Sequence, residues 1–163
     1  MPNNVHNKLT ITGPLLDRAE LQQLMAGETP FDFNKILPMP EELLGIATGS
    51  VTINGIKCNR WRIINKENVP LSETDKTELI VKYGAADWYD WARSHWGTKW
   101  NACFVEAQET PFRLIYDFTT AWSSPKNVID VLSTRFPRLK FKVSVSGEVD
   151  YPYVYEVETG ENQ

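Results

Sequence analysis

The stretch ACFVEAQETPFRLIYDFTTAWSSPKNVIDVLSTRFPRLKFKVSV, residues 102–145, decides the fold. A short apolar run at 102–105 indicates a strand, and apolar side chains at every second position of 112–118 indicate a second, half-buried strand. Ser124–Pro125 is expected to cap a helix, because apolar residues recur at helical spacing through 124–136. Alternation returns in 139–145. The stretch therefore predicts strand, strand, helix and strand.

The beginning of the chain adds one strand and one helix. Lys8–Thr12 alternates polar and apolar residues before Gly13–Pro14, and the following segment has the apolar spacing of a helix that ends near Gly27. The complete order is strand, helix, strand, strand, helix, strand. We expect an α+β fold with a ferredoxin-like βαββαβ core, whose antiparallel sheet carries both helices on one face.

The chain is predicted to form a single domain over residues 1–163. The core occupies about 5–27 and 101–146. A long inserted subdomain, about 28–100, separates the first helix from the second core strand. An acidic C-terminal segment, 147–163, follows the core.

The insertion contains local signals of its own. Asn54–Gly55 between apolar runs predicts a hairpin turn. Ser72 is a predicted helix N-cap and Gly84 the matching C-cap. A further helix is expected from about Ala86 to Trp96.

The composition indicates a globular protein. Hydrophobic residues make up 42% of the chain, which excludes the disordered class, and no apolar run has the ~20 residues that would span a bilayer. Cys58 and Cys103 lack metal or redox spacing, so buried free thiols are expected, although a disulfide stays open. No secretory signal is apparent at the N-terminus. These features predict a cytoplasmic protein that contacts no membrane.

Charge is distributed unevenly along the chain. The net charge is −4, and residues 147–163 contain acidic residues but no Lys or Arg, so the rest is nearly neutral. Carboxylates in such a segment can contact a basic surface on a partner. The candidate residues of this segment are Glu148, Asp150, Glu156 and Glu158.

The segment 83–100 is rich in tryptophan. Helical spacing places several of its aromatic side chains on one face. This stripe is interpreted either as a seam packed onto the core or as a partly exposed anchor for a partner, since Trp and Tyr dominate interface contacts. The candidate partner-binding residues are Trp88, Tyr89, Trp91, His95, Trp96, Lys99, Trp100 and Trp122.

Motifs that would indicate enzymatic chemistry are absent from the sequence. There is no G-x-S-x-G, no P-loop and no G-x-G-x-x-G. We predict no catalytic residue, no metal and no cofactor. An enzyme would need a cleft built from residues that no motif connects, namely Asp87, Asp90, His95 and Lys99.

The sheet face that the predicted helices leave uncovered, here called the open face, is a possible surface for binding a nucleic acid. The register opposite the apolar face is mildly basic but has no aromatic residues on which bases could stack, so recognition of the RRM type is not expected. Binding through Arg93, Lys99 and the tryptophans stays an alternative. The open-face residues are Lys8, Thr10, Thr12, Arg113, Asp117, Lys140, Lys142 and Ser144.

Several blocks resemble a known family. They are similar to the Api-type, or YubB-type, ferredoxin-like domain encoded by bacteriophages and plasmids. The blocks are Met1–Asn3 with Asn7–Gly13, Phe33–Leu43, Trp88–Trp91 with Trp96–Ala102, and Phe118–Trp122.

The resemblance implies a ferredoxin-like fold without iron or sulfur and a bacterial cytoplasm, and it brings no established activity. Because accessory proteins of mobile elements usually work by binding, we expect a non-enzymatic protein that binds a host protein, with inhibition of a host defence as its role. A nucleic-acid-binding accessory protein is the alternative. An uncharacterised enzyme ranks last.

Overall fold

The computed structural model describes residues 3–158, and contacts group the chain into two compact units. Unit 1 contains the described residues up to Pro38 and from His95 onward, and unit 2 is Met39–Ser94. Both ends of the expected insertion, 28–38 and 95–100, therefore belong to unit 1. No helix within residues 3–158 has the length and apolar character needed to cross a membrane.

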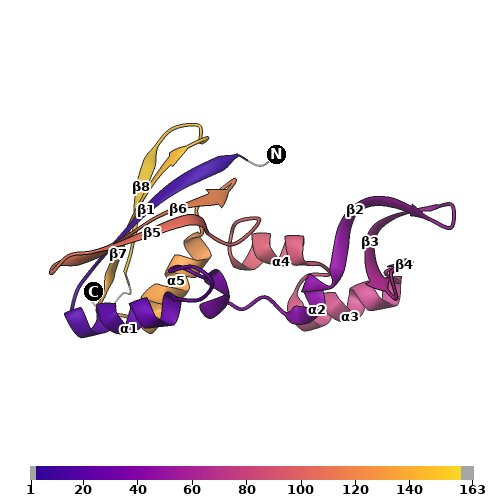
Figure 1. Cartoon of the computed structure of the whole chain (residues 1–163), viewed down its shortest axis with the longest axis horizontal. Helices are drawn as coiled ribbons and strands as arrows, with labels where there is room; N and C mark the ends of the chain where they lie inside the picture. Colours follow the sequence, from indigo (N-terminus) through magenta and orange to yellow (C-terminus); the bar gives the residue numbers. More distant parts are fainter. Residues whose placement is uncertain (1–2, 159–163) are drawn as a thin grey trace. The chain divides into compact units, whose positions relative to one another are not determined.

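Unit 1 is an antiparallel sheet with helices on one face. Its sheet order is β5-β6-β1-β7-β8, and each neighbouring pair is antiparallel. Helices α1 and α5 lie on the same side of this sheet (Figure 1). The predicted α+β class with an antiparallel sheet is confirmed. The elements are β1 (Asn4–Thr12), α1 (Leu15–Met25), η1 (Phe33–Lys35), β5 (Cys103–Glu109), β6 (Arg113–Ala121), α5 (Lys126–Arg135), β7 (Lys140–Gly147) and β8 (Tyr153–Val157).

The alternation in the sequence explains the core of unit 1. Strand β1 lies between β6 and β7, and its Leu9 stands opposite Tyr116 and Val143. All three side chains are buried, whereas the intervening Lys8 is exposed. One face of the sheet thus packs against the helices, as period-2 patterns predict.

Within unit 1, polar contacts connect residues 28–38 with residues 95–102. The buried Asp32 carboxylate accepts hydrogen bonds from the Asn34 backbone and the Asn101 side chain, at 2.9 and 2.8 Å. The Asn101 side-chain oxygen accepts in turn from the backbone N–H of Phe33, at 2.9 Å. The two bonds of Asn101 connect positions almost 70 residues apart in sequence, so the local sequence pattern could not reveal them.

Unit 2 contains a small sheet and three helices. The sheet order is β2-β3-β4, with both neighbouring pairs antiparallel. The last residue of α4, His95, is grouped with unit 1. The elements are α2 (Glu41–Leu44), β2 (Ile46–Ile53), β3 (Ile56–Ile64), β4 (Glu67–Pro70), α3 (Glu73–Tyr83) and α4 (Trp88–His95).

The predicted local signals of unit 2 are confirmed. Asn54 and Gly55 both have positive φ, at 52° and 80°, as a two-residue hairpin turn requires. The Ser72 hydroxyl accepts from the Asp75 N–H at 3.0 Å and begins α3. Gly84 ends α3 in the left-handed conformation, with φ of 80°.

Two sequence expectations need correction. Helix α5 begins at Lys126 without a side-chain cap, because the Ser124 hydroxyl bonds instead to the Tyr155 hydroxyl at 2.6 Å. Cys58 and Cys103 are free, but they are half-buried rather than buried. Burial raises the pKa of the Cys103 thiol above its usual value.

Candidate functional site

The tryptophan-rich segment divides into buried and exposed parts. Trp91 and Trp96 are only 5% and 3% exposed, so neither side chain is available to a partner on the surface. The Trp96 indole N–H donates to the Leu37 carbonyl at 2.8 Å, and its ring meets that of Phe33 edge-on at 5.7 Å. Trp96 is thus packed within unit 1, and Trp91 is buried within the chain.

Three other candidates in this segment are half-buried. The rings of Trp88 and Tyr89 meet edge-on at 5.9 Å, and the Arg93 guanidinium lies 5.4 Å from the Tyr89 ring centre. His95 is half-buried at the end of α4. Their part in partner binding stays a prediction.

Two tryptophans are exposed together in unit 1. Trp100 and Trp122 are 39% and 41% exposed. The Lys99 ammonium lies 4.9 Å from the Trp100 ring centre and 5.3 Å from that of Trp122. The Lys99 ammonium therefore makes a cation–π contact with each of the two indole rings. We call Lys99, Trp100 and Trp122 the tryptophan–lysine cluster.

Trp122 has an unusual backbone conformation. Its φ is 71°, in the left-handed region that a bulky residue rarely adopts and that costs about 1–3 kcal/mol. Its N–H donates to the Asn3 carbonyl at 2.9 Å, and the Thr120 hydroxyl donates to the Ser123 carbonyl at 2.7 Å. Strain of this kind persists where the surroundings impose it, and it is concentrated at functional sites.

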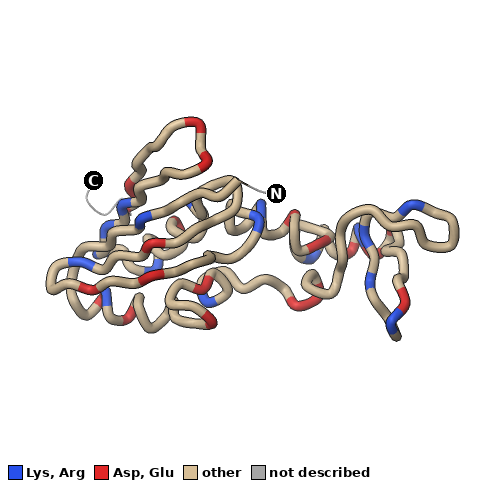
Figure 2. The backbone as a smooth tube through the Cα atoms, turned by 45° about the horizontal axis from the view of Figure 1, so that its top comes forward, with Lys and Arg blue, Asp and Glu red and all other residues tan. Residues whose placement is uncertain are grey.

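Trp122 forms part of a surface pocket of about 630 Å³. The other wall comes from the hairpin between β7 and β8, whose tip is acidic (Figure 2). Two carboxylates, those of Glu148 and Asp150, and two tyrosines, Tyr151 and Tyr153, line the pocket. Asn3, Ser123 and Val149 complete the lining.

The sheet topology brings these residues together. Strands β6 and β7 both run antiparallel to β1, so their C-terminal ends meet at the beginning of β1. Ala121 stands opposite Asn4 there, and Gly147 stands opposite Val5. Trp122 follows β6 directly and Glu148 follows β7 directly.

The acidic wall of the pocket is fixed by contacts with β1. Gly147 has a φ of 93°, and a Cβ there would lie 2.5 Å from the His6 ring and 2.9 Å from the Asn4 carbonyl. The Glu148 N–H donates to the Asn4 carbonyl at 2.9 Å, and the Glu148 carboxylate accepts from the Asn4 N–H. Glycine is therefore required at 147, and Glu148 is oriented before any ligand arrives.

Strand β8 supports the tyrosine wall. The rings of Tyr153 and Tyr155 are stacked with centres 6.3 Å apart. The Tyr155 hydroxyl bonds to Ser124, and burial raises the pKa of Tyr155 to about 12. The inner tyrosine thus attaches β8 to the start of α5, while Tyr153 lines the pocket.

The four predicted acidic residues separate into two pairs. Glu148 and Asp150 line the pocket, but Glu156 and Glu158 lie on or beside β8. Glu156 stands opposite Lys142 in the sheet, and the Glu158 carboxylate lies 3.9 Å from the Lys140 ammonium. These two carboxylates offset the positive charge of the open face.

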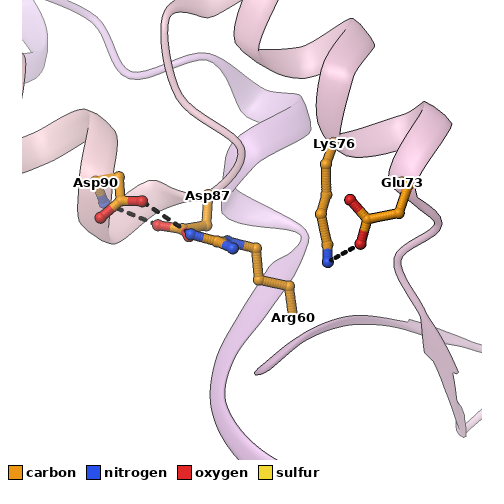
Figure 3. A network of polar contacts seen from close by, with 5 residues as sticks. All are labelled: Arg60, Glu73, Lys76, Asp87 and Asp90. Atoms are coloured by element: carbon orange, nitrogen blue, oxygen red, sulfur yellow. Dashed lines mark hydrogen bonds and ion pairs between the residues drawn. The ribbon is translucent and has the colours of Figure 1, made fainter. Parts of the chain in front are cut away.

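Asp87 and Asp90 are engaged in unit 2. Arg60 donates to the Asp87 carboxylate and, at 2.9 Å, to that of Asp90 (Figure 3). The Asp87 hydrogen bond is the main reason that the pKa of Arg60 lies above its usual value. Asp87 also accepts from the Asp90 N–H at 2.8 Å, at the start of α4. This arrangement is that of a structural ion pair.

Residues 3–158 contain no group of three or more His, Cys, Asp or Glu side chains placed to hold a metal ion. The pocket instead combines aromatic rings with carboxylates, a combination that suits an organic cation. Sequence reasoning identified Trp122, Glu148 and Asp150 but missed Tyr151 and Tyr153. Tyrosine at every second position of 151–155, followed by Val157, was the signal for a further strand.

No family model matches this sequence, and no curated protein matches it. A solved structure with a similar fold is the protein api92 from Yersinia pseudotuberculosis, of the family DUF1281. The TM-score is 0.58 at 12% sequence identity, over 97% of this chain and 95% of that chain. This likeness concerns the fold alone, and at that level it agrees with the resemblance to Api-type domains.

Proposed function

We propose that this protein is a non-enzymatic binding module that recognises another protein through the tryptophan–lysine cluster and the adjoining pocket. The observation that carries the proposal is Trp122, an exposed indole held in a strained conformation at the edge of the pocket. Tryptophan and tyrosine are the residues that most often dominate the energy of protein interfaces. Fixed contacts around Trp122 reduce the ordering cost of binding.

The charges at this surface favour a protein over a nucleic acid. Glu148 and Asp150 lie in the same pocket as Trp122, where they would repel phosphates. On the open sheet face, Glu156 and Glu158 offset Lys142 and Lys140. Binding of a nucleic acid through Lys99 and Trp100 therefore ranks second.

The biological setting forms a separate part of the proposal. The order β5-β6-β1-β7, with a helix after β1 and another after β6, supports a ferredoxin-like core. The sequence blocks that resemble Api-type domains support an accessory protein of a phage or plasmid. We infer that its partner is a host protein of the bacterial cytoplasm, bound in order to inhibit a host defence.

The test is affinity capture with the tagged full chain from a nuclease-treated bacterial lysate, followed by calorimetry with the purified captured protein. Trp122→Ala should weaken binding at least tenfold, as expected for a hot spot. Phe112→Ala is the matched control, because Phe112 is another exposed aromatic residue that precedes β6, whereas Trp122 follows it. The two positions are about 30 Å apart along the strand.

The proposal requires that the Trp122→Ala variant bind the captured partner more weakly than wild type does. Equal binding by Trp122→Ala and wild type would contradict it, and so would capture of material from an untreated lysate but of none from the nuclease-treated lysate. The second result would favour nucleic-acid binding instead, and a steep loss of affinity with salt would then be expected.

A further inference from the structure

The pocket beside Trp122 is large enough to admit a side chain of a partner protein. Its volume of about 630 Å³ lies within the range of ligand pockets. Two carboxylates and three aromatic side chains line it, and no Lys or Arg is among the described residues that do so. The lining is therefore anionic and aromatic at once.

The carboxylates of the pocket are not neutralised by residues 3–158. Neither Glu148 nor Asp150 forms an ion pair with a basic side chain of that range. One oxygen of Glu148 is oriented by the Asn4 N–H, which leaves the other oxygen able to accept from a ligand. A cation in the pocket would meet acceptors that are already positioned.

The chain itself demonstrates that Trp122 accepts a cation. The Lys99 ammonium lies 5.3 Å from its ring centre, within cation–π range. Lys99 is not among the residues that line the pocket, so it does not occupy the space between Trp122 and the acidic hairpin tip. The same aromatic residue therefore stands beside a second place for positive charge.

We propose that this pocket receives an arginine side chain of the partner protein, stacked on the aromatic rings and hydrogen-bonded to Glu148 and Asp150. This inference rests on the proposed function. A guanidinium is planar and weakly hydrated, stacks on aromatic faces and donates to two carboxylate oxygens together, whereas a lysine ammonium is a strongly hydrated point charge. Arginine is also enriched in interface hot spots.

The experiment is a titration of the full chain with the peptide acetyl-Gly-Arg-Gly-amide. Binding is monitored by the NMR signals of the tryptophan indole N–H groups. The matched probes replace arginine by neutral citrulline or by lysine. We expect the arginine peptide to shift the Trp122 signal and to bind about tenfold more tightly than the citrulline peptide. Lysine should lie between them.

Variants locate the site. Glu148→Gln and Asp150→Asn should each weaken arginine binding several-fold, and the charge reversal Asp150→Lys should abolish it. Glu156→Gln is the control, because Glu156 lies on β8 away from the pocket lining, and it should leave the affinity unchanged. Equal binding of the citrulline and arginine peptides would overturn the inference, as would a Trp122 signal that does not shift at about 10 mM peptide.

Comparison with the capture experiment separates this inference from the proposed function. A partner lost by Trp122→Ala but retained at full affinity by the double variant Glu148→Gln, Asp150→Asn would overturn the arginine inference and leave the proposed function intact. Arginine-specific binding in a chain whose Trp122→Ala variant captures partners as well as wild type would overturn the proposed function, and only the arginine specificity of the pocket itself would stand.

Discussion

Unit 1 and unit 2 are stabilised by different means. In unit 1 the rings of Phe31, Phe33 and Phe118 meet edge-on with centres 5.0–6.4 Å apart, and all three are buried. In unit 2 most residues of the three-stranded sheet are exposed or half-buried, and the Arg60–Asp87 ion pair joins β3 to the start of α4. Apolar packing dominates the first unit, and an ion pair of a half-buried arginine with a buried carboxylate is central to the second.

The largest effect is expected from the aromatic core of unit 1. Phe31 is fully buried and contacts the rings of Phe33, Tyr116 and Phe118. Phe31→Ala should lower the free energy of unfolding by about 3–5 kcal/mol, because it removes apolar burial and leaves a cavity. Urea unfolding monitored by fluorescence measures this change. Phe112→Ala, at an exposed site, should stay within about 0.5 kcal/mol of wild type, and a similar loss in both variants would refute the comparison.

The next effect concerns unit 2. Arg60→Met leaves the Asp87 carboxylate, which is only 2% exposed, without its ion-pair partner. The expected cost is about 2–4 kcal/mol, since an unpaired buried charge is costly. Hydrogen exchange should become faster in β3 and α4 but not in β1. Arg62→Met is the matched control, because its ion pair with Asp75 is largely solvated and contributes at most about 0.5 kcal/mol.

Alkaline pH should affect unit 1 selectively. Burial raises the pKa of Tyr116 and Tyr155 from 10.0 to about 12, and both residues belong to unit 1. Because the folded pKa is the higher one, the stabilisation is complete below pH 10 and is lost as the pH rises towards 12. Each tyrosine should cost about 1.4 kcal/mol at pH 11.

Tyr155→Phe provides the test of that titration. The variant should lose about 1 kcal/mol at pH 8, because the hydrogen bond to Ser124 is removed. Its free energy of unfolding should then fall less than that of wild type between pH 8 and pH 11, measured by urea unfolding at both values. An equal fall in the two proteins would show that folding does not raise the pKa of Tyr155.

The smallest effect isolates the strain at Trp122. Glycine adopts a φ of 71° without penalty, whereas alanine does not. Trp122→Gly should therefore be about 1 kcal/mol more stable than Trp122→Ala. Both variants remove the indole, so both should lose partner binding equally. If Trp122→Gly were no more stable than Trp122→Ala, the backbone at this position would not be strained.

Particular residues show where turn and cap signals in the sequence predicted the local structure and where they did not. Asn54–Gly55 and the caps at Ser72 and Gly84 were predictable because turn and cap chemistry is decided by neighbouring residues. The beginning of α5 was predicted too early, since Ser124 bonds to Tyr155 instead of capping the helix. Strand β8 was missed because its pairing with β7 was not evident from an acidic segment.

The sequence by itself determined the α+β class, the strands and the helix of residues 102–145, and the aromatic and acidic candidates, because period and composition are local properties. Only the tertiary structure decided which candidates share a site. Trp122 and Glu148 line the same pocket because β6 and β7 flank β1 and both end beside the first residues of β1. It also placed Trp96 in the core and Trp100 on the surface, since burial depends on contacts between segments distant in sequence.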